Sequence, residues 1–111
     1  MDDLQQILAS LGELESILTE HDCPEPNPSA LSRVRLLAAQ MAGYDSYVSA
    51  EAARISALAG IFYSDRNHAT HQGGTSALLI EIAYDLPNRI RGQIAHLRRI
   101  QKERDELNDD E

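Results

Sequence analysis

The 111-residue sequence has no tryptophan, a single phenylalanine and a single cysteine. One cysteine excludes a framework of disulfides within the chain, and this fits a reducing cytoplasm. With so few aromatic residues, a core must be built from leucine, isoleucine and alanine, which favours packed helices over a β-sandwich. No run of about 18 apolar residues occurs, and no basic-then-apolar leader opens the chain. We therefore expect a cytoplasmic protein with no membrane contact.

Basic residues are also scarce, with 10 Lys and Arg against 18 Asp and Glu and a net charge of −8. An acidic protein repels the phosphate backbone, so broad nucleic-acid binding is disfavoured. The acidity has two interpretations. It keeps a small protein soluble, or it forms a surface that docks on a basic partner, as a nucleic-acid mimic would.

Residues 1–20 predict a first amphipathic helix. Its apolar residues alternate three and four apart and form a heptad seam: Leu4, Ile7, Leu11, Leu14 and Leu18. Such a seam either packs inside the same chain or forms the interface of a homodimer. We take the seam as a candidate dimer interface, and the acids of the same segment as candidate contacts to a basic partner: Glu13, Glu15 and Glu20.

The segment "HDCPEPNPS" at residues 21–29 has a proline at every second position, which predicts an extended linker. Such a linker would let the first helix pack on another subunit. Ser29 is a good N-cap for the next helix. We expect one long or kinked helix over residues 30–63, although Gly43 could divide it into helices at 30–42 and 46–63.

Residues 75–107 predict a last helix that is broken or kinked near Pro87 and followed by a frayed tail at 108–111. Seven acids in the first 28 residues and six basic residues between 89 and 104 predict that the first and last helices pair, within a chain or across a dimer. The chain is thus expected to be a single all-α domain with three to four amphipathic helices, arranged as an up-and-down bundle or an interlocked helical dimer.

The polar loop "SDRNHATHQGG" at residues 64–74 carries the residues with the most evident chemistry. Asp65, His68 and His71 are spaced by three, and zinc accepts such ligands. Cys23 with His21 is a weaker pair. A structural zinc site usually has paired, close-spaced ligands from two places in the chain. We therefore expect solvated histidines here, with no metal and no cofactor.

Within this loop, an arginine and a polar residue are followed by three further residues and a histidine. The residues are Arg66, Asn67 and His71, placed before the last helical segment, and "DLPNRIRGQI" follows further on. This arrangement resembles HEPN-domain ribonucleases, including the HepT-like toxins. The resemblance implies that His71 acts as acid and base, that Arg66 binds the scissile phosphate with support from Asn67, and that two motifs face each other across a dimer without a metal.

The leading functional hypothesis is a non-enzymatic, homodimeric interaction module that docks its acidic surface on a protein partner. A small regulator, an adaptor, or an inhibitor from a phage or mobile element would have these features. The alternative is a HEPN-like, metal-independent ribonuclease toxin, and only this alternative requires contact with RNA.

Overall fold

The computed structural model describes residues 3–23, 25–63 and 74–109, which form helices and contain no strand. The elements in chain order are α1 (Asp3–Glu20), α2 (Pro28–Met41), α3 (Ser46–Phe62), α4 (Gly74–Ile80), a π-helical turn η2 (Glu81–Asp85) and α5 (Leu86–Asp109). The expectation of an all-α fold is confirmed.

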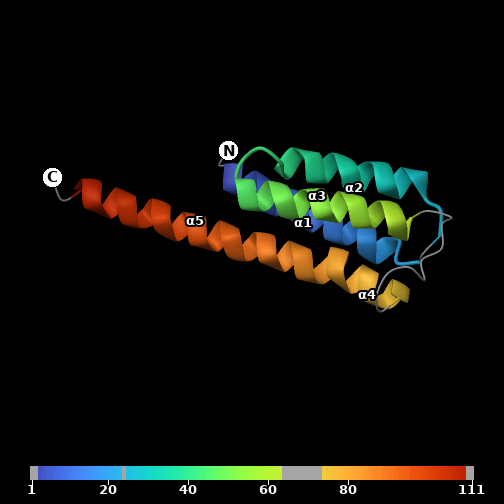
Figure 1. Ribbon diagram of the computed structural model, residues 1–111. Coiled ribbons are helices and arrows are strands. Elements are labelled where there is room, and N and C mark those ends of the chain that lie inside the picture. Colours follow the sequence, from blue (N-terminus) through green and yellow to red (C-terminus); the bar gives the residue numbers. More distant parts are fainter. Residues whose placement is uncertain (1–2, 24, 64–73, 110–111) are drawn as a thin grey trace.

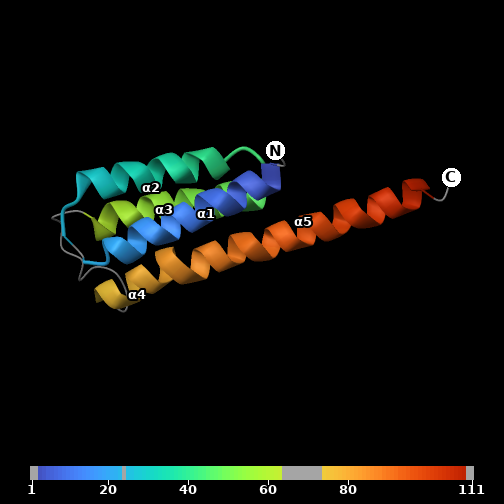
Figure 2. The same cartoon turned by 180° about the vertical axis from the view of Figure 1, so that it is seen from behind.

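The helices form an up-and-down bundle within one chain (Figures 1 and 2). α1, α2 and α3 alternate in direction, and α1 packs on α2 beside it. The last three elements follow one another as a single helical run that returns along α1 and α3. The N-terminus and the α2–α3 turn lie at one end of the bundle, and both views show α5 continuing past that end. The resulting molecule is elongated, with extents of 60 × 26 × 20 Å.

The core contains one apolar face from each helix. The predicted heptad seam of α1 faces inward, and none of its five residues is more than 4% exposed. Opposite it lie Val34, Met41, Val48, Ile55 and Phe62 from α2 and α3, and Leu78, Ile82, Leu86, Ile90 and Ile94 from the last helical run. Full burial of a side chain of this size contributes about 1.5–3 kcal/mol, so this core is the main source of stability.

The preferred prediction of one helix over residues 30–63 is wrong, and the alternative division at Gly43 into two helices is correct. α2 ends at Met41, and Gly43 adopts a φ of 93°, a left-handed conformation that glycine reaches without a steric penalty. Asp45 then caps α3, because its carboxylate accepts hydrogen bonds from the backbone N–H groups of Tyr47 (3.0 Å) and Val48 (3.2 Å). These two signals fold the chain back on itself and give α2 and α3 opposite directions.

The start of α2 also differs from the prediction. The helix begins at Pro28, not at residue 30, and its N-cap is Asn27 in place of Ser29. The Asn27 side chain accepts a hydrogen bond from the Ala30 N–H at 3.1 Å. Proline suits the first position of a helix because its missing N–H would have no partner there and its φ is already helical.

Tyr63 joins three parts of the chain at the end of α3. Its hydroxyl donates to the carbonyl oxygen of His21, just after α1, at 2.7 Å. Its own carbonyl accepts from the Asn27 N–H at 3.3 Å, and its ring packs edge-to-face on Phe62 with ring centroids 5.0 Å apart. Burial, together with the charge of Asp22, raises the pKa of Tyr63 to about 12.

We predict that Tyr63→Phe lowers the free energy of unfolding by about 1 kcal/mol at neutral pH, because one partly buried hydrogen bond is lost. The hydroxyl must be protonated to donate. The folded-state pKa lies above the unfolded value of about 10, so the contribution is complete below about pH 10 and lost as pH rises toward 12. Urea unfolding of both proteins across this range checks the prediction. A stability difference that stays constant up to about pH 12 would contradict it.

The last helix was predicted to be broken or kinked near Pro87. The chain stays helical there, but the regular α-helix is interrupted: the π-helical turn η2 precedes Pro87, and the Leu86 N–H bonds to the Glu81 carbonyl, five residues back. A proline ring clashes with the carbonyl four residues earlier in a regular helix, and a wider turn relieves that clash. α5 also extends to Asp109, two residues into the predicted frayed tail.

Candidate functional site

The candidate catalytic residues Arg66, Asn67 and His71 lie outside the described residues, as do Asp65 and His68. The described part of the chain does contain the weaker metal pair, in which His21 and Cys23 are both exposed. Within that part, no group of three or more His, Cys, Asp or Glu could hold a metal ion. The ribonuclease interpretation of the 64–74 loop stays a prediction.

The seam of α1 does not form a dimer interface in this fold. Its residues Leu4, Ile7, Leu11, Leu14 and Leu18 are buried in the core, and α1 packs against α2, η2 and α5 of the same chain. A side chain that is already covered leaves no apolar area for a partner. The interface assignment for these five residues is therefore corrected to core packing.

The predicted pairing of the first and last helices is confirmed within one chain. Glu15 of α1 and Arg91 of α5 form a two-pronged ion pair, with Arg91 Nη1 at 2.8 Å from Glu15 Oε2 and a second contact between Nη2 and Oε1. The hydrogen bond to Glu15 raises the pKa of Arg91. Glu15 is thus engaged internally, and only Glu13 and Glu20 of the three candidate acids lie exposed on α1.

We predict a coupling free energy of about 0–1 kcal/mol between Glu15 and Arg91 in a double-mutant cycle of Glu15→Gln and Arg91→Gln. Both side chains are partly exposed, so solvent and salt screen the attraction. Urea unfolding of the four proteins at low and at high salt measures the coupling. A coupling unchanged by salt would contradict the expectation that the pair is screened.

Two further ion pairs attach the last helical run to α3. Arg54 Nη2 lies 2.7 Å from Glu81 Oε1, and Arg89 Nη1 lies 3.8 Å from Glu51 Oε2. These pairs, with Arg91, lie on the part of the run that packs on the bundle. Further along α5, the basic residues have no ion pair within the described part of the chain: Arg98, Arg99, Lys102 and Arg104.

The part of α5 from Leu97 to Leu107, here named the projecting segment, extends past the bundle (Figure 1). Its residues beyond Leu97 are all exposed. The apolar residues Leu97, Ile100 and Leu107 continue the three-and-four spacing of the buried Leu86 and Ile90. The face of α5 that packs on the bundle therefore continues along the projecting segment, where Ile100 is 39% exposed and Leu107 is 71% exposed.

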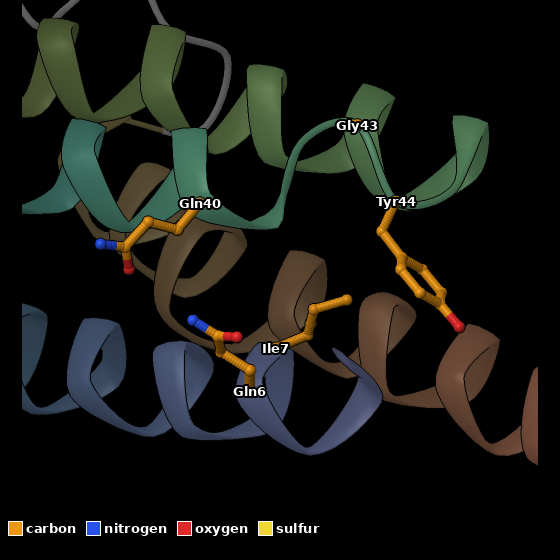
Figure 3. A pocket seen from close by; sticks show the side chains of 5 residues that line it. All are labelled: Gln6, Ile7, Gln40, Gly43 and Tyr44. Carbon is orange, nitrogen blue, oxygen red and sulfur yellow. The ribbon is translucent and has the colours of Figure 1, made fainter. Parts of the chain in front are cut away.

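A hollow lies at the end of the bundle from which α5 projects. It has a volume of about 360 Å³ and is lined by Gln6, Ile7, Gln40, Gly43 and Tyr44. Figure 3 shows the side chains of α1 and α2 approaching it from opposite sides, with the Tyr44 ring at one edge. On the same α2–α3 turn, Asp45 accepts a hydrogen bond from Gln93 Nε2 of α5 at 3.2 Å.

This bond fixes the α2–α3 turn against α5 just before the projecting segment begins. Two tyrosines flank Asp45, and both Tyr44 and Tyr47 remain exposed. The α2–α3 turn, with an exposed tyrosine on each side of Asp45, therefore lies beside α5 near the start of the projecting segment.

The candidate sites predicted from the sequence do not include this surface. Helix length explains the exposure, since α1, α2 and α3 have 18, 14 and 17 residues in the structure, whereas α5 alone has 24. Shorter helices cannot cover a longer one along its whole length.

No protein-family model, curated protein or solved structure matches this chain. In the described ranges, no helix has the length and apolar character that crossing a membrane requires.

Proposed function

We propose that this protein is a helical protein–protein interaction module, and that it acts as a regulator, adaptor or inhibitor by docking through the projecting segment. One observation carries the proposal: the apolar face of α5 continues for three turns past the end of the bundle, where no other described helix covers it. Partner helices and grooves recognise apolar residues at such spacing on an otherwise charged helix.

The charges around this face support the same proposal. The projecting segment carries basic and acidic residues on its remaining faces, and these would form the polar rim of an interface while the apolar residues form its centre. Glu13 and Glu20, which stay exposed on α1, are available to a basic partner surface.

Capture of partners with the purified protein tests the proposal. We compare the unaltered chain, the variant Ile100→Glu with Leu107→Glu, and a matched control, Leu36→Glu, which changes an exposed leucine on α2. A partner that the unaltered chain and the control retain, and the double variant loses, supports docking through the projecting segment. Equal retention by all three proteins contradicts it.

The alternative function is metal-independent RNA cleavage by Arg66 and His71. One observation favours it: α4 begins at Gly74, so the motif directly precedes the last helical run, as the resemblance to HEPN-domain ribonucleases implies. A neutral imidazole can move the 2′-hydroxyl proton, and a guanidinium stabilises phosphate charge. We would incubate the protein with a mixed RNA pool and EDTA beside the His71→Ala variant. Cleavage by both proteins, or by neither, rules out this role for His71.

A further inference from the structure

We propose that the π-helical turn η2 is a register switch for the helical segment that precedes Pro87. The structure shows a first register, in which η2 holds one extra residue between α4 and α5. In a second register the segment continues α5 as a regular α-helix, so it turns by about 100° and moves outward by about 1.5 Å. Single π-helical turns inside α-helices often occur at functional sites. The switch lies apart from the projecting segment and does not depend on docking there.

The apolar residues of this segment suit both registers. A move by one place gives each side chain the position of the residue before it. Leu79 then takes the fully buried position of Leu78. In the same way, Ala83 takes the fully buried position of Ile82. Both incoming residues are apolar and already pack against the core from its edge, so neither move buries a polar side chain.

The outward face of the segment favours the second register. Ile80 is 55% exposed and Tyr84 is 66% exposed in the structure, which leaves apolar area in contact with water. In the second register these side chains take the half-buried positions of Leu79 and Ala83. The acidic residue that follows each of them in the sequence takes the outermost position instead. The register therefore decides whether this face of the segment is apolar or acidic.

Three features hold the first register. Pro87 is buried at the start of α5, and its ring would clash with the carbonyl four residues earlier in a regular helix. Arg54 of α3 donates two hydrogen bonds to Glu81 Oε1, from Nε at 3.1 Å and from Nη2 at 2.7 Å, and the second register carries Glu81 away from α3. Ile82 is also larger than Ala83, which would replace it in the core. The first register is thus the resting state.

A basic partner surface is the ligand that this switch would recognise. A ligand shifts an equilibrium between two states by its difference in affinity for them. In the second register Glu81 is released from Arg54 and lies outermost beside Asp85, where both carboxylates are available to a basic surface. In the first register Ile80 and Tyr84 occupy those positions. Binding of a basic partner at this face would therefore draw the segment into the second register.

Cysteine labelling at residue 83 tests the switch. In a Cys23→Ser background we introduce Ala83→Cys and measure its rate of reaction with a thiol reagent. We compare the otherwise unaltered chain with a released protein, which also carries Arg54→Gln and Pro87→Ala. Residue 83 is half-buried in the first register and lies in the core in the second, so labelling should be at least about tenfold slower in the released protein. Ala95→Cys, at an exposed position of α5, is the matched control and should label equally in both backgrounds.

The direction of the change separates the switch from a loss of structure. A helix that only loosens exposes residue 83 and makes labelling faster. Slower labelling therefore supports the second register. Equal or faster labelling of Ala83→Cys in the released protein overturns it.

A second pair of variants keeps the test decisive if the released protein is too unstable for labelling. Ala83→Ile gives the second register the core side chain that Ile82 supplies in the first. In the released background this substitution should raise the urea midpoint of unfolding. In the unaltered chain it changes a half-buried position and should leave the midpoint nearly unchanged. The same effect of Ala83→Ile in both backgrounds overturns the proposal.

Discussion

Leu11→Ala is expected to lower the free energy of unfolding by about 2–5 kcal/mol, since a buried leucine loses both its transfer free energy and its packing contacts. Leu11 lies at the middle of α1 and is 0% exposed. α1 packs against α2, η2 and α5, so the cavity left by the substitution is enclosed by three other elements. The surrounding helices can close it only in part, which places the loss well above that of an average substitution.

Urea unfolding of both proteins at two protein concentrations checks this prediction. Because the α1 seam is buried by its own chain, the loss caused by Leu11→Ala should be the same at both concentrations. A loss that grows with dilution would show instead that a second chain covers the seam. Leu36→Ala is the matched control, because the α2 leucine is 60% exposed and should cost no more than about 0.5 kcal/mol.

The seam shows what sequence periodicity can and cannot determine. The spacing of Leu4, Ile7, Leu11, Leu14 and Leu18 identifies which face of α1 is buried, and the structure buries that face. It does not identify what buries it, since the hydrophobic effect is non-directional and acts equally on a covering helix from the same chain or from another. The helix class was therefore predictable, and the seam's assignment to a dimer was not.

The false prediction of one helix over residues 30–63 has a similar cause. Val34, Met41, Val48, Ile55 and Phe62 recur every seven residues across both α2 and α3, and all five are buried. The α2–α3 turn preserves the phase of the pattern while it reverses the direction of the chain. Only Gly43 and the capping carboxylate of Asp45 mark the turn in the sequence. When a helix boundary is predicted, two such local signals carry less weight than an apolar pattern that repeats over about 30 residues.

The candidate site was predictable only in part. Leu97 and Ile100 belong to an apolar stripe that is visible in the sequence. Their exposure, however, depends on how far along α5 the helices α1 and α3 reach, and this reach is set only when the bundle assembles. Leu107 lies among charged residues, where a single leucine gives no periodic signal. The loop motif of Arg66 and His71 stays a prediction from sequence alone.

The π-helical turn explains an apolar spacing that a regular helix could not bury. Leu78, Ile82, Leu86, Ile90 and Ile94 recur every four residues, and each is at most 2% exposed. In a regular α-helix, positions four apart drift by about 40° per step, or about 160° over this series. The wider turn η2 accommodates about one extra residue and removes about 100° of that drift. The five side chains can then face one core.

Deletion of Asp85, an exposed residue of η2, should therefore remove the extra residue and let a regular α-helix align the same five core side chains. The deletion alone is expected to destabilise the fold by about 3 kcal/mol, because it forces Pro87 into the interior of a regular helix. Combined with Pro87→Ala, the deletion should bring the free energy of unfolding back to within about 1 kcal/mol of the unaltered chain, since the clash is gone and the core register is kept. Urea unfolding of the three proteins measures both steps. If the double variant is as unstable as the deletion alone, the π-helical turn serves some purpose other than accommodating Pro87 and aligning the core.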